Sequence, residues 1–411
     1  MAVLVYDQPE LYGLAGNDNP FVFRSTNYTP TQRFKIVVLP AGYPTIPALS
    51  TVRVYPRQSI TQNGVVDYDR AYYDPSRILQ TQLGTDIAIP SSGHAGYFDS
   101  PNMHFEYNLF IQEEDLIGGV WTLGDLYVSS QKSVWNGGVN LVDWLTFDYD
   151  AYDMDASNSL RSYLTQSPTT KYIDTNQSAS LGFLSSDNNI SKCNVVSYDA
   201  AGAVVQSGSF AFTMAGKYGR VAIGTYDLTS SDPAIWTGAT PSNILVGASY
   251  YTIQVEGTNA QKLHTYHIDA GCSKYETVRL HWLNRLGAFD SFNFDMKSTL
   301  KTSVKRDSFV KEHHGFTGTR WKYDTMSSGE TNYHTATDES LKINSDYMSE
   351  DESVWMEDLF TSPVVYREVR NELIAYNISG KSITRQTSLN DKLMQYTFDV
   401  APSLTNTRQR G

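Results

Sequence analysis

The sequence predicts a mostly β protein, in which tandem immunoglobulin- or fibronectin-like β-sandwich modules precede a small α+β domain at the C-terminal end. Short runs of β-branched and aromatic residues recur along the 411 residues, and clusters of Gly, Asn, Asp, Ser and Pro separate them. Aromatic residues make up 13% of the chain and charged residues only 18%, whereas about a quarter of an average domain is charged. Because the chain is too long for one hydrophobic core, we expect about three domains, at residues 1–150, 151–296 and 297–411.

The first domain is predicted to be a sandwich with one short helix. Its strand-like segments are residues 21–24, 33–38, 52–55, 105–110 and 121–128.

The helix of the first domain is predicted over residues 73–84. Asp74 can cap its start, Pro75 suits its first turn and Gly84 can end it. Leu79 and Leu83 share one face, so we expect the helix to close one end of the sandwich.

The second domain is predicted to follow an acidic, Ser-rich linker at residues 148–170. A hairpin is expected at residues 195–205, because Asp-Ala-Ala-Gly between two β-branched runs fits a type I turn closed by a left-handed Gly202. The domain ends at residues 277–294 with two strands about a turn that contains Gly287. Further strands are expected at residues 220–223, 250–255 and 265–268.

The last domain opens with a Ser/Thr-rich, strand-like run at residues 297–311 that carries five basic residues. A helix is predicted near residues 349–360, where Ser349 and Glu352 form a capping box. One helix against a small antiparallel sheet makes an α+β domain. The strands of that sheet are expected at residues 364–370, 373–378 and 393–400.

The charge balance and the cysteine count exclude several classes of protein. A formal net charge of -12 argues against a nucleic-acid binder, because phosphate affinity comes mainly from Lys and Arg. Two cysteines, Cys193 and Cys272, cannot build a disulfide framework or a four-thiolate zinc site. The N-terminal segment does not resemble a secretory signal, and no apolar run approaches the ~18 residues that would span a bilayer.

Two clusters of metal-ligand residue types are candidate metal sites. His264 and His267, with Cys272 nearby, lack a fourth ligand, and an i,i+3 pair on a strand points to opposite faces, so we favour packing and turn histidines over zinc. Asp148, Asp150, Asp153 and Asp155 suggest a calcium loop, but Gly and Glu are missing where an EF-hand needs them. A hydrated acidic linker is the preferred interpretation.

No catalytic motif is present. The sequence holds no Gly-x-Ser-x-Gly elbow and no phosphate loop, and the carboxylates of Glu113 and Glu114 would point apart on a strand. We therefore expect that the protein has no enzymatic activity and binds no cofactor. The 28 tyrosines suit sugar stacking, protein contacts or the filling of the sandwich cores.

Residues 275–294, with VRLHWLNRLGAFDSFNF at 278–294, resemble a segment of virion structural proteins of tailed bacteriophages, especially those of Bacteroidetes-type hosts. Residues 73–79, the helix and strand between residues 345 and 366, and the ending 393–400 with Arg408 and Arg410 occur in similar order in such proteins. The resemblance touches all three domains.

The resemblance implies a non-enzymatic component of the tail, baseplate or neck ring, made in the bacterial host cytoplasm and placed in the virion. Its partners would be copies of itself in a ring and other tail or neck proteins. Neither nucleic acid nor a membrane is an expected partner. A carbohydrate-binding adhesion module and a glycan depolymerase are the alternatives. The expected inter-subunit packing residues lie in i,i+4 pairs on the predicted C-terminal helix, and each of them could instead lie in the core of its own domain: Trp355, Met356, Leu359 and Phe360.

Overall fold

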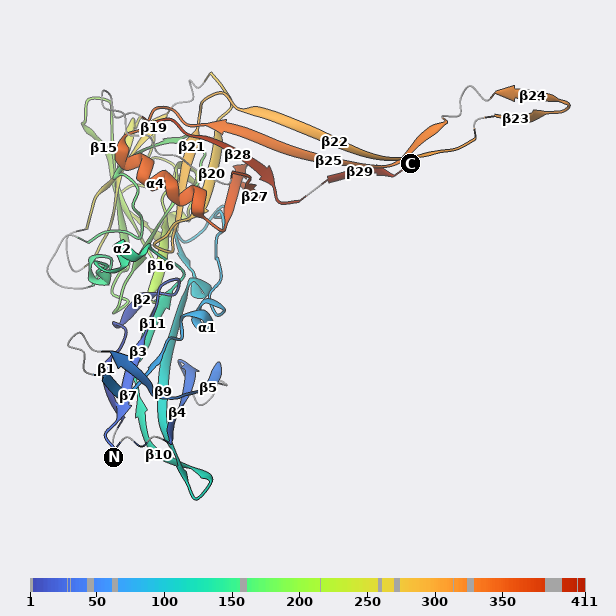
Figure 1. The fold of residues 1–411 in the computed structure, drawn as a ribbon. Coiled ribbons are helices and arrows are strands. Elements are labelled where there is room, and N and C mark those ends of the chain that lie inside the picture. Colours follow the sequence, from blue (N-terminus) through green and yellow to red (C-terminus); the bar gives the residue numbers. More distant parts are fainter. Residues whose placement is uncertain are drawn as a thin grey trace. The chain divides into compact units, whose positions relative to one another are not determined.

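The computed structural model describes most of the chain, as Figure 1 shows. The described residues are 3–27, 29, 31–42, 48–60, 66–155, 161–214, 216–257, 261–269, 274–312, 314–323, 329–380, 394–404 and 406–410.

The predicted mostly β architecture is confirmed. The described residues form 29 strands and four α-helices. The chain divides into two compact units, of which unit 1 comprises Met1–Gly271 and Leu283–Asp290, and unit 2 comprises Cys272–Trp282 and Ser291–Gly411. Division into three domains at 150/151 and 296/297 stays a prediction.

Two sheets of unit 1 form its first sandwich. Phe21 and Phe23 of one sheet face Phe34 and Ile36 of the other in a shared core, with the rings of Phe23 and Phe34 edge to face at 5.0 Å. The first sheet runs β1 (Val3–Asp7), β3 (Phe21–Ser25), β7 (Val66–Tyr73), β6 (Arg57–Ile60). The second runs β2 (Tyr12–Leu14), β11 (Lys132–Trp135), β9 (His104–Ile117), β4 (Gln32–Pro40), β5 (Ser50–Val54), and β10 (Val120–Val128) pairs with β9.

A second pair of sheets in unit 1 encloses another core. Val195 and Ile253 of the larger sheet meet Phe183 and Val221 of the smaller one. The larger sheet runs β12 (Thr170–Asp174), β19 (His264–Asp269), β18 (Tyr250–Val255), β14 (Lys192–Tyr198), β15 (Val204–Ala211), β17 (Trp236–Thr237). The smaller runs β13 (Ser180–Leu184), β16 (Tyr218–Ala222), β8 (Tyr97–Asp99). Strand β8 precedes residue 150 in the sequence but completes this later sandwich.

Unit 2 is an eight-stranded sheet with one helix, the α+β arrangement that the sequence predicts. Helix α4 (Glu350–Thr361) begins at Ser349, whose capping box with Glu352 is present as predicted. The sheet runs β21 (Phe289–Phe294), β20 (Val278–Leu283), β26 (Val365–Val369), β27 (Glu372–Ile378), β28 (Thr397–Pro402), β25 (Glu330–Asn344), β22 (Thr299–Val310), and β29 (Asn406–Arg410) also pairs with β25. A separate hairpin joins β23 (His314–Thr317) and β24 (Arg320–Tyr323).

The remaining helices are short. Helix α1 (Ser76–Gln80) is shorter than the predicted 73–84; Asp74 accepts a hydrogen bond from the Ser76 backbone N–H at 2.9 Å, and Leu79 is buried in the first core as expected. None of the helices in the described residues is long and apolar enough to cross a membrane. The others are α2 (Leu141–Trp144), α3 (Thr225–Ser230) and the 3-10 turns η1 (Pro101–Met103), η2 (Tyr149–Ala151) and η3 (Pro233–Ile235).

The turn between β20 and β21 belongs to unit 1. Trp135 Nε1 donates a hydrogen bond to the Leu286 carbonyl at 2.8 Å, and the Tyr218 hydroxyl donates one to the Gly287 carbonyl at 2.9 Å. Gly287 has a φ of +81°, as the predicted turn requires. A β-carbon there would collide with the Asn136 carbonyl oxygen.

Gly287→Ala is therefore expected to destabilise unit 1 strongly. Gly247→Ala is the matched control, because Gly247 has a φ of +79° and open space around it. The control should cost about 1–2 kcal/mol of unfolding free energy from the left-handed backbone alone, and Gly287→Ala about 1–3 kcal/mol more from the collision. Urea unfolding measures both, and equal losses would contradict the close packing of this turn.

Candidate assembly surfaces

The four helix residues predicted to pack between subunits lie in the core of unit 2. Trp355 is 2% exposed, and Met356 and Leu359 are fully buried. Phe360 is partly buried and packs against the same core. The Trp355 ring lies 5.2 Å from that of Trp282, between ring centroids. The core of unit 2 covers these three side chains, and among the four only Phe360 keeps part of its surface exposed. Packing between subunits through this helix stays a prediction.

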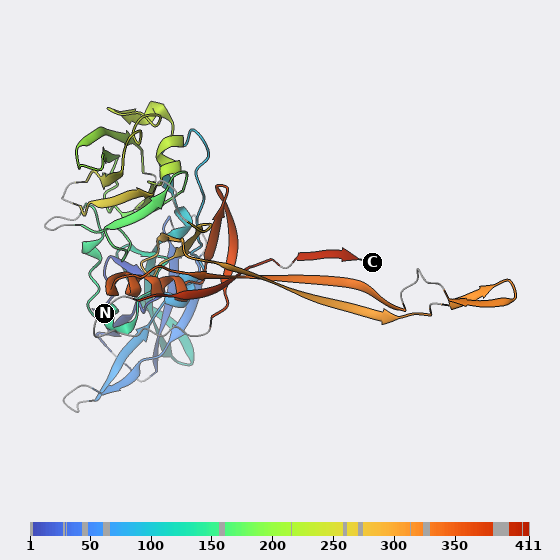
Figure 2. The same cartoon turned by 90° about the horizontal axis from the view of Figure 1, so that it is seen from above.

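A long β-hairpin of unit 2 provides exposed residues. Strands β22 and β25 run side by side away from α4 and β27, and the β23–β24 hairpin lies beyond their far end (Figures 1 and 2). We call residues 299–344 the arm. The sequence predicts its first strand but not β25, which has 15 residues.

The arm has almost no core of its own. Of its described residues, only Leu341 and Ile343 belong to the core of unit 2. Eleven of the twelve residues of β22 are exposed. Among them Leu300 is 62% and Val310 82% exposed, and Phe309, Trp321 and Tyr333 are also exposed apolar side chains.

Strand β22 is also an open sheet edge. Among the described residues it pairs with β25 alone, whereas β25 pairs with β22 on one side and with β28 and β29 on the other. Twelve residues at about 3.4 Å each leave an edge about 40 Å long, whose outward N–H and C=O groups can pair with another strand.

A second exposed hairpin lies in unit 1, between β9 and β10. Gly118 and Gly119, both at positive φ, form its two-residue turn. Val120 is 67% exposed, and Ile117, Leu123, Leu126 and Val128 are exposed as well. Strand β10 pairs with β9 alone among the described residues, so its other edge is open.

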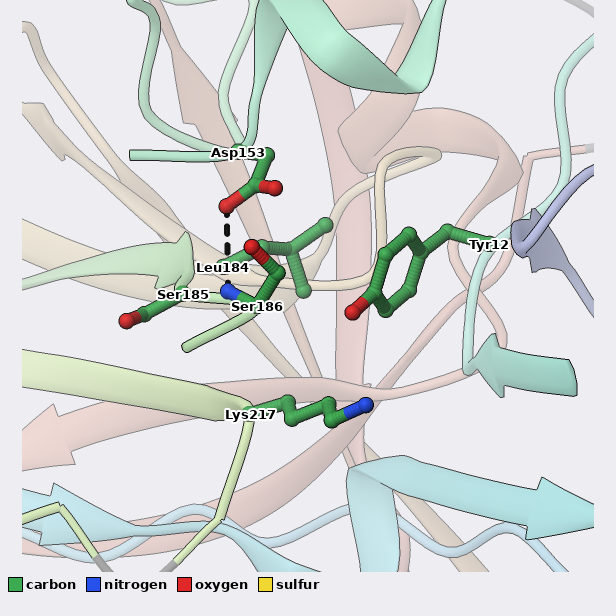
Figure 3. Close-up of a pocket in the computed structure, with 6 residues that line it drawn as sticks. All are labelled: Tyr12, Asp153, Leu184, Ser185, Ser186 and Lys217. Atoms are coloured by element: carbon green, nitrogen blue, oxygen red, sulfur yellow. Dashed lines mark hydrogen bonds between the residues drawn. The ribbon is translucent and has the colours of Figure 1, made fainter. Parts of the chain in front are cut away.

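Figure 3 shows a small hollow in unit 1 that has no room for a water-sized molecule, whereas small-molecule sites enclose roughly 300–1,000 Å³. Asp153 Oδ1 accepts a hydrogen bond from the Ser186 N–H at 3.1 Å, and Lys217 Nζ lies 3.2 Å from Glu106 Oε1. Burial raises the pKa of Tyr12, against the attraction of Lys217. Asp153 and Lys217 therefore each have a polar partner. The hollow is lined by Tyr12, Asp153, Leu184, Ser185, Ser186 and Lys217.

The acidic segment that the sequence predicts to be a hydrated linker is instead folded into unit 1. Asp153 is buried, and its Oδ1 also accepts a hydrogen bond from the Asp155 N–H at 3.1 Å. Asp155 Oδ2 accepts one from the Asp187 N–H at 3.0 Å, and Asp148 caps η2. These carboxylates fix backbone turns, which charge counting along the sequence does not reveal. No group of three or more His, Cys, Asp or Glu suited to a metal occurs within the described part of the chain.

The two strand histidines are packing residues. His264 is buried with its ring edge to face with that of Tyr163, at 5.1 Å between centroids. The His267 ring lies 5.4 Å from that of Tyr172. Cys272, the third member of the group considered for zinc, lies outside the described residues. Burial, together with repulsion from Lys171 and Lys262, lowers the pKa of His264 to about 3.

His264 therefore predicts a loss of stability in acid. The folded state holds the imidazole neutral, whereas an unfolded histidine takes up a proton below about pH 6.5. Its contribution is fully present above about pH 6.5 and is lost as the pH falls toward the folded pKa of about 3, by up to about 1.4 kcal/mol per pH unit.

The measurement is urea unfolding at pH 7.5 and pH 4.5. His264→Gln should lose about 2–3 kcal/mol less than the wild type between these values. His267→Gln, on the same strand but partly exposed, is the control. An identical loss in the wild type and in His264→Gln would contradict a buried neutral histidine.

The comparisons with known proteins identify no family. No protein family profile matches the sequence, and no curated protein matches it. One similar solved structure is a marsupial T cell receptor, at a TM-score of 0.21 and 9% identity, covering 84% of this chain and 96% of that one. Values this low establish no shared fold or function, so the function is argued from the surfaces above.

Proposed function

We propose that this chain is a non-enzymatic structural component of a tailed phage virion, in the tail, baseplate or neck ring. It assembles into a symmetric multimer with copies of itself and contacts other tail or neck proteins. The resemblance of residues 275–294 supports the phage assignment. The observation that carries the assembly role is the arm.

The arm has the properties of a segment that becomes stable through a partner. A ribbon of two or three strands without a hydrophobic face packed against a core is marginally stable in water. The arm projects such a ribbon, with exposed Leu300, Phe309 and Val310 along an open edge. A protein that acts alone gains nothing from this exposed surface, whereas a subunit buries it against its neighbour.

Symmetry follows from the kind of contact. When an arm on one subunit meets a different surface on the next, the contact is heterologous and closes into a ring if the rotation allows. This agrees with a place around the axis of a tail or neck.

Immunogold electron microscopy of purified particles, with antibody to this chain, tests the virion role. Gold at the tail or neck is the expected result. Light scattering on the purified chain should give the mass of a multimer. Particles without gold, before and after mild disruption, would contradict the proposal. Binding of a monomer to host glycans, or release of reducing ends from them, would then favour an adhesion module or a depolymerase.

A further inference from the structure

We infer that the open edge of β22 in one copy pairs with the open edge of β10 in the neighbouring copy, which joins the two subunits by a continuous sheet. This inference rests on the proposed function and names the contact through which assembly occurs.

Strand β10 has the features of an edge that a partner covers. Its sequence, VWTLGDLYV, has one charged residue, Asp125, and no proline. Leu126 and Val128 are exposed and lie two residues apart, so they share one face of the strand. Proteins protect free edges with charges, prolines or a covering element, and an apolar edge of this length invites pairing with another chain.

Strand β22 is long enough to cover the whole of β10 and also has exposed apolar residues. It has 12 residues against nine in β10. Leu300 and Val304 are exposed on one face, at the spacing of i and i+4 in a strand. Pairing the two edges would satisfy the main-chain groups of both strands and would bring these apolar rows together.

The β9–β10 hairpin is acidic, whereas strand β22 with its flanking residues is basic. Residues 104–128, which contain β9 and β10, hold five acidic residues and neither Lys nor Arg. Glu114 pairs with Arg33 at 2.6 Å and with Arg53 at 3.1 Å. Residues 297–311, which contain β22, hold five basic residues and one acidic residue.

The same asymmetry extends to the whole of unit 1. It holds 26 acidic and 15 basic residues, a net charge of -11. A basic edge strand is therefore attracted to the acidic unit of another copy, and two β22 strands repel each other. This charge complementarity selects a second copy, contacted head to tail, as the occupant of the β10 edge.

Thiol cross-linking tests the pairing on the full chain. Thr122 on β10 and Ser303 on β22 are exposed, and each is replaced by cysteine. Cys193 is buried and free, and Cys272→Ser removes the other native thiol. Thr299→Cys and Lys305→Cys replace Ser303→Cys in parallel samples, so that an offset in register does not hide the contact. The reagent is a short bismaleimide.

The double variant Thr122→Cys/Ser303→Cys, or one of its register counterparts, should give a ladder of dimers, trimers and larger products under denaturing conditions. A mixture of the two single variants should stop at dimers, and each single variant alone should give none. An internal link within one chain, or dimers from Ser303→Cys alone, would overturn the inference.

A wild-type chain that is monomeric at every concentration would contradict the proposed function itself. A wild-type multimer without any ladder would contradict the β22–β10 pairing alone, so the two failures are distinguishable.

Charge reversal gives a second readout. Lys301→Glu/Lys305→Glu should reduce the multimer fraction at least tenfold at low salt, because it opposes the acidic hairpin. Arg320→Glu/Lys322→Glu, on β24, makes the same change in net charge away from the β22 edge and should leave assembly intact. Equal effects of the two double variants would contradict a contact through β22.

Discussion

Removal of the arm is expected to convert the multimer into monomers and to leave unit 2 folded. The variant replaces residues 303–338 by Asn-Gly. Thr302 and Glu339 face each other across β22 and β25, so a two-residue turn can join them. Leu341 and Ile343, the core residues of β25, remain in place.

The arm deletion should separate the subunits without unfolding unit 2, because it removes exposed surface and almost no core. The stub of β22 keeps only four residues of edge, 299–302, which are too few to hold a second subunit by strand pairing. Light scattering should give the mass of one chain, and urea unfolding of unit 2 should change little.

A shorter deletion separates the shaft of the arm from its tip. Replacing residues 311–329 by Asn-Gly joins Val310 to Glu330, which also face each other, and keeps all of β22. This variant should still form the multimer. If it is monomeric, the β23–β24 tip makes the contact between copies, and if the full deletion remains multimeric, the arm has no part in assembly.

Local signals in the sequence were sufficient for the turns and the long helix. Gly202 and Gly287 have positive φ where the hairpins were predicted, and Ser349 caps α4. These features depend on neighbouring residues, so a single sequence reveals them. Pairings between distant segments leave no such local signal. Strand β8, for example, pairs with β16, which lies about 120 residues further along the chain.

The assembly surfaces were also beyond what a single sequence reveals. Strand β25 has mainly Thr, Asn, Ser and charged residues, so its hydrophobic period is weak and the sequence predicts only a polar stretch there. The apolar pairs of α4 gave a strong signal, but they could not show whether the partner is another chain or the sheet of the same unit. Burial resolved this: Trp355 meets Trp282 in the core of unit 2.

Trp355→Ala is therefore expected to destabilise unit 2 by about 3–5 kcal/mol, the cost of removing a large buried aromatic side chain. Its ring lies 5.2 Å from that of Trp282 and 5.9 Å from that of Phe292, between centroids, so truncation leaves a cavity beneath the helix. Urea unfolding followed by circular dichroism measures the loss.

Trp321→Ala is the matched control, because Trp321 is half exposed on β24. It should change the unfolding free energy by less than about 0.5 kcal/mol. Assembly and stability should fall together in Trp355→Ala, because the side chain acts through the core that anchors the arm. A variant that keeps its stability but loses the multimer would instead place Trp355 at a contact between copies, since only a direct contact could separate the two effects.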